Sequence, residues 1–89
     1  MEDEIIKFLR YPYKGVVNYA LDLVQLSKKE REAVMLCGMQ KMTVEEAAEA
    51  ARPQVSRNTM QKRWSDARSQ LIRAWSGIEW IETLANTVE

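Results

Sequence analysis

The sequence predicts an all-α protein, a small helical bundle. Three observations lead to this fold class. The 89 residues are enough for one compact domain with a modest core. No segment sustains the alternation of apolar and polar residues that a half-buried strand shows. Alanine, glutamate, lysine, glutamine, methionine and leucine, which favour helices, dominate the chain, and apolar residues recur every three or four positions.

Residues 1–25 are predicted to form an N-terminal helical segment. A short helix is expected over residues 3–10, and Pro12 ends it or begins the next element, because proline cannot donate a backbone hydrogen bond. A second helix then runs to about Gln25. The apolar residues at helical spacing in this segment are predicted to face the core: Ile5, Phe8, Leu9, Tyr13, Val17, Ala20, Leu21 and Val24.

A capping box at Ser27 and Glu30 predicts the start of the next helix. The Ser27 hydroxyl accepts a hydrogen bond from a backbone N–H of the first turn, and the Glu30 carboxylate reaches back three residues to accept another. The helix is expected to extend to Leu36 or Met39. Its buried residues are predicted to be Ala33, Val34, Leu36 and Cys37, the last as a small buried filler.

Thr43 and Glu46 repeat the capping box and predict a short, alanine-rich helix over residues 44–51. Small residues there permit another helix to approach closely. The pair Glu45-Glu46 is interpreted as favourable negative charge in the first turn of this helix. Arg52-Pro53-Gln54 ends the helix, because proline disfavours helical geometry at the residue before it.

Ser56 is predicted to cap a longer helix that ends at Ser76-Gly77, since glycine is a natural C-terminal cap. Apolar residues step along this helix by three or four positions and form one inward-facing stripe: Met60, Trp64, Ala67, Leu71 and Trp75. The opposite side carries polar and basic residues: Asn58, Lys62, Ser65, Ser69 and Arg73, with Arg57 and Gln61 at its margin. The final amphipathic segment holds Ile78, Ile81, Leu84, Ala85 and Val88 beside Trp80.

The charges of the chain are unevenly placed, although 13 basic and 13 acidic residues give no net charge. From Arg52 to Arg73 there are six basic residues and only Asp66 as an acid, so this segment carries a charge of +5. Such asymmetry is typical of a localised site for a polyanion. The alternative interpretation is a solvated helix face without a ligand.

Two short helices, a turn and a long basic helix form the pattern of a helix-turn-helix. In this motif the first helix supports the second, and the long recognition helix presents its N-terminal turns to base edges in the major groove. Arg57, Asn58, Gln61 and Lys62 are expected to point to DNA. Arginine forks onto guanine, asparagine or glutamine onto adenine, and lysine meets guanine or phosphate.

Residues 26–71, roughly half of the chain, resemble region four of bacterial sigma factors and the sigma-like small regulators of phages. The stretch LRYPYK at residues 9–14 also looks like short phage-encoded late transcription activators. The matching residues of the larger segment are Leu26-Ser27, Glu30-Arg31, Val34, Thr43, Glu45-Glu46, Ala47-Ala48-Glu49, Val55-Ser56, Asn58-Thr59-Met60, Arg63-Trp64, Ala67-Arg68 and Leu71.

The resemblance implies a role and a set of site residues. A region-four module recognises a promoter element through the helix that matches residues 56–71, and it also contacts RNA polymerase. In this family Arg63 matches a basic position associated with the DNA backbone or with structural pairing, and Ser56 matches the cap. The predicted DNA-binding residues are Arg57, Asn58, Gln61, Lys62, Arg63, Ser65 and Arg68.

Three positions depart from the family pattern. Arg52-Pro53-Gln54 makes a turn about two residues longer than the usual turn, which holds a glycine before the Val-Ser pair. Trp64 replaces a smaller aliphatic residue, so the core beneath it has to be roomier. Asp66 stands where a basic residue is common, and Lys62, one turn earlier, is a partner for its carboxylate.

Composition excludes several classes of function. Without histidine, and with a single cysteine, the chain lacks the ligands of a zinc cluster and the base of a Ser-His or Cys-His pair. Its three glycines lie too far apart for a phosphate-cradling loop. We therefore predict no enzyme, no cofactor and no metal site. No apolar run approaches the roughly 20 residues of a membrane span, and the acidic first residues are unlike a signal peptide, so a cytoplasmic location without membrane contact is expected.

The predicted function is a sequence-specific DNA-binding transcriptional regulator of phage or prophage type, with double-stranded DNA and RNA polymerase as partners. Two alternatives stay open: a DNA-binding module similar to the small subunit of a phage packaging machine, and a helix-turn-helix that binds polymerase without DNA. Residues 26–77 are predicted to form the region-four-like helix-turn-helix, within one compact domain. Residues 78–89, a C-terminal amphipathic segment, either form a homodimer interface or fold back on the N-terminal helices.

Overall fold

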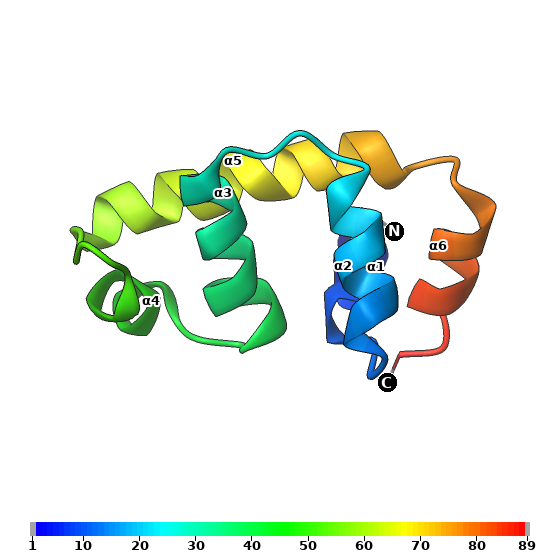
Figure 1. The fold of residues 1–89 in the computed structure, drawn as a ribbon, viewed down its shortest axis with the longest axis horizontal. Helices are drawn as coiled ribbons and strands as arrows, with labels where there is room; N and C mark the ends of the chain where they lie inside the picture. The colour runs from blue at the N-terminus through cyan, green and yellow to red at the C-terminus, as the bar shows by residue number, and fades with distance from the viewer. Residues whose placement is uncertain (1, 89) are drawn as a thin grey trace. The chain divides into compact units, whose positions relative to one another are not determined.

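The computed structural model describes the backbone of residues 2–88 and the side chains of residues 4–88. This part of the chain is all-α, as predicted, and contains no strand (Figure 1). In chain order the elements are α1 (Glu2–Ile6), the 3-10 helix η1 (Lys7–Arg10), α2 (Lys14–Asp22), α3 (Lys28–Ala33), the π-helix η2 (Val34–Met39), α4 (Val44–Ala50), α5 (Arg57–Trp75) and α6 (Glu79–Ala85).

Contacts between residues group the chain into two units. The central unit is Leu26–Arg68, and the terminal unit joins the residues up to Gln25 with those from Ser69 onward. The second boundary falls inside α5, which is one continuous helix. The N-terminal part of α5 therefore belongs to the central unit, and its last two turns belong to the terminal unit.

The central unit contains α3, η2, α4 and the first part of α5, which are coloured teal to yellow-green in Figure 1. Both predicted capping boxes are present, at Ser27 with Glu30 and at Thr43 with Glu46. Each hydroxyl accepts a hydrogen bond from the glutamate N–H, at 3.2 and 3.1 Å. The buried core is made largely of small residues, which lets these short helices approach closely: Ala33, Leu36, Ala47, Ala48, Ala51 and Met60.

The second half of the helix that begins at Lys28 differs from the prediction, because after Ala33 it continues as the π-helix η2. The backbone N–H of Gln40 donates to the carbonyl of Met35, five residues earlier, at 3.0 Å. This wider turn moves the side chains off the 3.6-residue register. Cys37, predicted as a buried filler, is consequently half-buried, with its side chain at the edge of the core.

The turn after α4 is held by hydrogen bonds from two backbone N–H groups inside the central unit. α4 ends at Ala50, close to the predicted end, and the Arg52–Pro53 peptide bond is cis. The backbone N–H of Arg52 donates to Glu32 Oε2 at 3.2 Å, and that of Val55 donates to the Ala48 carbonyl at 3.2 Å. These bonds fix the path of the chain from α4 into α5 despite the longer turn.

The terminal unit contains α1, η1, α2, the end of α5 and α6. Trp75 is fully buried, its indole Nε1 donates to the Ala20 carbonyl at 3.1 Å, and the ring meets that of Phe8 edge to face at 5.4 Å. A buried indole removes a large apolar area from water, and because its N–H is hydrogen-bonded, no polar group is left without a partner. The other buried residues of this unit are Ile5, Leu9, Val17, Leu21, Leu71, Ile81 and Ala85.

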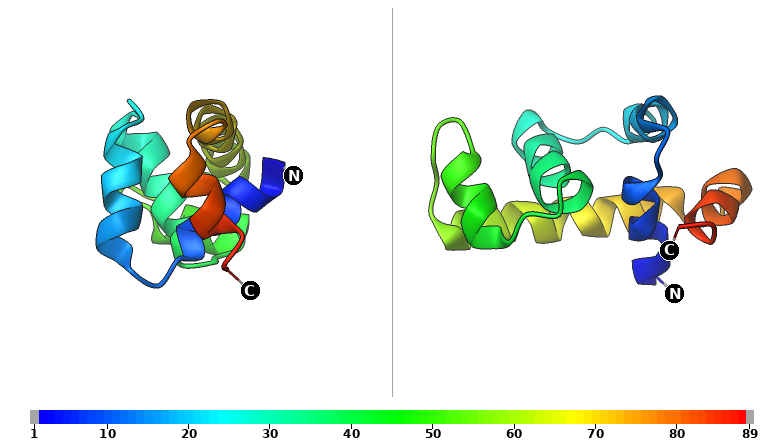
Figure 2. Two further views of the ribbon diagram at one scale, coloured as in Figure 1. Left: turned by 90° about the vertical axis from the view of Figure 1, so that its right-hand side faces the viewer. Right: turned by 90° about the horizontal axis from the view of Figure 1, so that it is seen from below.

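The C-terminal segment folds back on the N-terminal helices. α6 packs against α1 and η1 and lies beside them in both views of Figure 2. Ile81 and Ala85 are buried there, and the ring of Trp80 meets Phe8 at 6.1 Å. Of the two interpretations of residues 78–89, the apolar face of α6 therefore fits the one in which it packs within its own chain.

Two sequence predictions fail in α2. Tyr13 was expected in the core but is 69% exposed, because it is the residue before the helix and the helical repeat does not extend to it. The helix also ends at Asp22, three residues before the predicted end. The N–H of Leu23 and that of Val24 then bond to carbonyls three residues earlier, as in a tightening last turn.

Candidate nucleic-acid interface

The N-terminal turns of α5 start at Ser56, as the sequence predicts. The Ser56 hydroxyl accepts a hydrogen bond from the backbone N–H of Thr59 at 3.2 Å, and the Ser56 carbonyl accepts one from Met60 at 3.0 Å. Such a cap satisfies one of the backbone donors that the first turn of a helix leaves without partners. The candidate recognition surface therefore begins directly after Ser56.

The inner side of α5 sets the rotation of the helix about its axis. Met60 and Ala67 are fully buried, and Trp64 packs against the central core while remaining partly exposed. Residues on the opposite side must then face solvent. The predicted DNA-binding residues that are exposed are Arg57, Asn58, Gln61, Lys62, Ser65 and Arg68, whereas Arg63 is half-buried.

Arg57 is tied to a neighbouring helix by a contact that the sequence analysis missed. Its Nε donates to Oε1 of Glu45, a residue of α4, and its Nη1 donates to Oε1 of Gln61 at 2.8 Å. The Glu45 carboxylate was interpreted only as favourable charge in the first turn of α4. No local spacing rule connects Glu45 with Arg57, because the two residues lie 12 positions apart on different helices.

Arg57 also changes the ionisation of its partner. The hydrogen bond from Arg57 is the main cause that holds the pKa of Glu45 below its ordinary value, and a hydrogen bond from the Glu45 backbone adds to it. Both side chains are more than half exposed, so solvent screens much of their attraction. The pair therefore orients two side chains more than it stabilises the fold.

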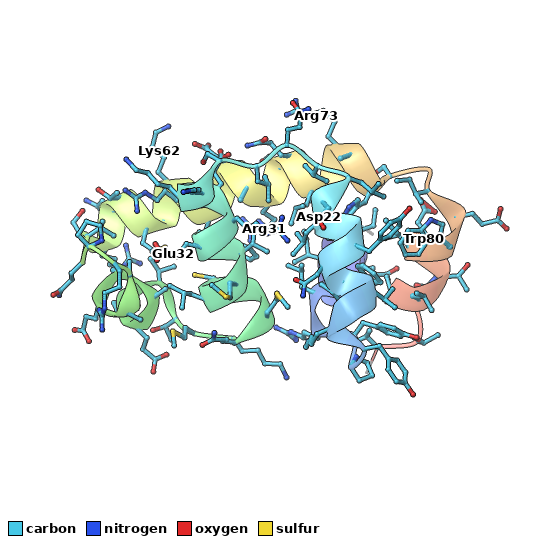
Figure 3. All side chains as sticks on the ribbon, in the orientation of Figure 1. Asp22, Arg31, Glu32, Lys62, Arg73 and Trp80 are labelled. Atoms are coloured by element: carbon cyan, nitrogen blue, oxygen red, sulfur yellow. The ribbon has the colours of Figure 1, made fainter. Side chains whose placement is uncertain are left out.

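Lys62 has the partner that its spacing predicts. Its Nζ lies 3.3 Å from Oδ2 of Asp66, one helical turn further on. The lysine side chain is 78% exposed and extends outward from α5 in Figure 3. A pair this exposed is easily exchanged for another anion, so Asp66 lowers the local positive charge without removing Lys62 from the surface.

Trp64 and Arg68 form a third contact on the flank of α5. The guanidinium carbon of Arg68 lies 5.8 Å from the centre of the Trp64 ring, within the range of a cation–π contact. Trp64 serves as an anchor to the core, as predicted, but it is not fully enclosed. Its ring also supports the Arg68 side chain, a function that the helical stripe alone does not indicate.

The surface of the central unit is basic overall. The unit has nine basic and six acidic residues, a net charge of +3. Of the four basic side chains on its part of α5, Arg57 and Lys62 are paired with carboxylates. Arg63 and Arg68 are the other two. This arrangement suits an anionic ligand, because the exposed Lys62–Asp66 pair is weak and an oxygen of the ligand can replace its carboxylate.

Other kinds of site have little support in the described residues. They contain no group of three side chains that would hold a metal ion. Partial burial raises the pKa of the Cys37 thiol, so that the nucleophilic thiolate is scarce at neutral pH. None of the described helices has both the length and the apolar character that a membrane crossing requires.

Comparison of the chain with protein-family models, with curated proteins and with solved structures gave no match. The geometry of the candidate site is therefore what bears on its function. It consists of a capped helix, anchored by an apolar side, whose outer side carries arginine, asparagine, glutamine, lysine and serine.

Proposed function

We propose that this protein is a sequence-specific DNA-binding transcriptional regulator that reads the major groove with α5 from Ser56. The observation that carries the proposal is the two-sidedness of the first part of α5. Met60, Trp64 and Ala67 hold it against the central core, while polar and basic side chains stand on the outer side. In a helix-turn-helix, α4 would be the supporting helix and α5 the recognition helix.

The outer side chains suit both parts of DNA recognition. Arg57, Asn58 and Gln61 are exposed on the first turns of α5, where a recognition helix meets base edges. Lys62, Arg63 and Arg68 provide positive charge for phosphates, which position the protein without reading sequence. Because bound cations release counterions from DNA, the affinity should fall steeply with salt concentration.

The first test is selection of bound fragments from random or genomic DNA, repeated at two salt concentrations. A sequence enriched at moderate salt supports a regulator, whereas salt-sensitive binding without any enriched sequence points to non-specific DNA handling, as in the packaging alternative. Sedimentation separates the same alternatives, because a large ring is typical of packaging subunits and a dimer is typical of regulators that read two half-sites.

The second test uses single substitutions on the outer side of α5. Arg57→Ala and Lys62→Ala are each expected to weaken binding by about tenfold or more while the circular dichroism spectrum stays helical. Arg10→Ala and Lys7→Ala, which remove equal charges from exposed residues of η1, are the matched controls. Unchanged affinity in both α5 variants would contradict the assignment of α5 as the recognition helix.

A polymerase-binding module that does not bind DNA is the second candidate. The observation that favours it is the pairing of Arg57 with Glu45 and of Lys62 with Asp66, which leaves less uncompensated charge for phosphates. Capture of RNA polymerase by the intact protein, with no DNA binding at low salt, would favour this candidate over a DNA-binding regulator.

The proposal includes a homodimer, and the open point is which surface of the protein would form it. Ile81 and Ala85 of α6 are buried and α6 packs against α1 and η1, which favours a dimer surface outside these residues. Sedimentation equilibrium of the intact chain over a range of concentrations measures the state directly. A monomer at all concentrations would leave recognition of a single half-site.

A further inference from the structure

We propose that Glu45 and Gln61 hold Arg57 as a reader of guanine, so that the first turn of α5 recognises one G·C base pair by the two acceptors of guanine. This role of Glu45 rests on the proposed function, because it has meaning only if α5 enters the major groove. It extends that function by naming the base recognised and by adding a positioning residue, Glu45, which lies outside the recognition helix.

The hydrogen bonds of Arg57 decide which of its groups remain for a ligand. A guanidinium has five N–H donors and no acceptor. One of them, on Nε, is directed to Glu45 Oε1, and one on Nη1 is directed to Gln61 Oε1 at 2.8 Å. Neither contact uses Nη2. Arg57 thus keeps donors for a ligand while two of its nitrogens are fixed in direction by residues on both sides.

The same hydrogen bond restricts Gln61. A glutamine reads adenine by donating from its amide nitrogen to N7 and accepting at its amide oxygen from N6. In this protein the Gln61 oxygen is turned towards Arg57 and already accepts from it. The oxygen has a second lone pair, but because it is directed at Arg57, the amide nitrogen is turned away from Arg57. Gln61 should therefore act towards a ligand mainly as a donor.

Together the two side chains form a surface of donors. In the major groove, guanine is the base that offers two neighbouring acceptors, N7 and O6, whereas adenine pairs one acceptor with one donor. A surface made mainly of donors therefore favours guanine over adenine, whose N6 amino group needs an acceptor. The hydrogen-bonded group of Glu45, Arg57 and Gln61 would thus select guanine both by binding its acceptors and by disfavouring adenine.

Glu45 contributes by restraining a flexible side chain. An exposed arginine samples many rotamers and is attracted to any nearby phosphate. The Glu45 carboxylate, fixed on α4 by its position in a capped helix, holds Nε and partly compensates the positive charge. It should thereby reduce binding to unrelated DNA and improve discrimination at the base that Arg57 faces.

The experiment combines base substitution with two matched protein variants, all in the full chain. Within the selected sequence, each guanine is replaced in turn by 7-deazaguanine, which lacks the N7 acceptor, and by adenine. The Arg57→Ala variant identifies the position that depends on Arg57. Glu45→Gln removes the carboxylate that holds Arg57, and Glu49→Gln makes the same charge change at another exposed glutamate of α4.

The unmodified protein is expected to lose about tenfold or more in affinity at one guanine when N7 is removed, and Arg57→Ala should abolish that loss. Glu45→Gln should reduce the discrimination at this same base to about twofold and raise the affinity for unrelated DNA. Glu49→Gln should raise the affinity for all DNA slightly and leave the discrimination unchanged.

Two results overturn the role of Glu45 while leaving the proposed function intact: an adenine at the position that depends on Arg57, or full discrimination for guanine in Glu45→Gln. Absence of DNA binding by the unmodified protein overturns the proposed function itself, and the role of Glu45 with it. Because Glu45 is exposed and outside the core, a circular dichroism spectrum suffices to show that Glu45→Gln is folded.

Discussion

The central and terminal units of this chain differ in charge and in the way their cores are built. The central unit has nine basic and six acidic residues, whereas the terminal unit has four basic and seven acidic ones, so their net charges are +3 and −3. Six of the seven aromatic residues lie in the terminal unit, and Trp64 is the exception. A neutral chain thus contains two oppositely charged parts, which the bulk composition conceals.

The two cores show that short helices are packed by different means. Alanine lines much of the central core, in which α4 lies close to η2. The terminal core instead relies on Phe8 and Trp75, whose large rings bury much apolar area where the two ends of the chain meet. The proposed DNA-binding residues belong to the central unit, whose core has the smaller side chains.

The largest expected effect is on the terminal core. Trp75→Ala should lower the free energy of unfolding by about 4 kcal/mol, because it removes a fully buried ring and its hydrogen bond to Ala20. Urea denaturation gives the total loss, and amide hydrogen exchange shows which unit loses protection. Trp80→Ala, at a ring that is 38% exposed, is the matched control and should lose clearly less. Equal losses in the two variants would contradict the description of Trp75 as the core residue.

The next effect is on the central core. Met60→Ala should cost about 3 kcal/mol, since Met60 is fully buried among alanines that are too small to fill the space it leaves. The same urea measurement applies, with Met35→Ala, at a residue that is 45% exposed, as the control. A Met60→Ala protein as stable as the control would mean that the central core is looser than its buried residues indicate.

A smaller effect is expected from the capping boxes, which occur in the central unit. Thr43→Ala should destabilise the protein by about 1 kcal/mol, because the N–H of Glu46 loses its acceptor. Thr43→Ser keeps the hydroxyl and should stay close to the unmodified protein. If thermal denaturation places the serine variant with the alanine variant, the methyl group of Thr43 matters and the cap does not.

The smallest effect concerns the pH dependence of the Glu45–Arg57 pair. The pKa of Glu45 is lowered in the folded protein, so the pair contributes above the ordinary carboxyl pKa of 4.5, and its contribution is lost as the pH falls through the lowered value. An NMR titration should find the pKa of Glu45 below the ordinary carboxyl value. In Arg57→Ala the Glu45 value should move back up towards 4.5. A Glu45 titration unaffected by that substitution would show that the pair does not persist in solution.

Local spacing predicted much of this structure correctly. Both capping boxes, the span of α5, its buried side and the Lys62–Asp66 pair depend on residues three or four positions apart. At this separation the geometry of a helix alone determines which side chains meet. The same rule explains why most of the predicted DNA-binding residues are exposed. They lie on the side of α5 opposite to its buried residues.

Contacts between distant residues were not predictable in this way. Glu45 meets Arg57 across 12 positions, Glu32 meets the backbone of Arg52 across 20, and Trp75 bonds to Ala20 across 55. Such contacts depend on how whole helices pack, and many pairings of these helices satisfy the same apolar pattern. The π-helical turn at η2 belongs to this group, because it shifts the register from within an otherwise regular segment.

The sequence by itself determined which segments are helical, where most of them begin and which side of α5 faces the core. The tertiary structure alone decided that the two ends of the chain form one unit and that Glu45 lies beside Arg57. The physical reason is one of range. The backbone hydrogen bonds and the periodicity of a helix act over a single turn, whereas the pairing of helices results from the burial of apolar area summed over the whole chain.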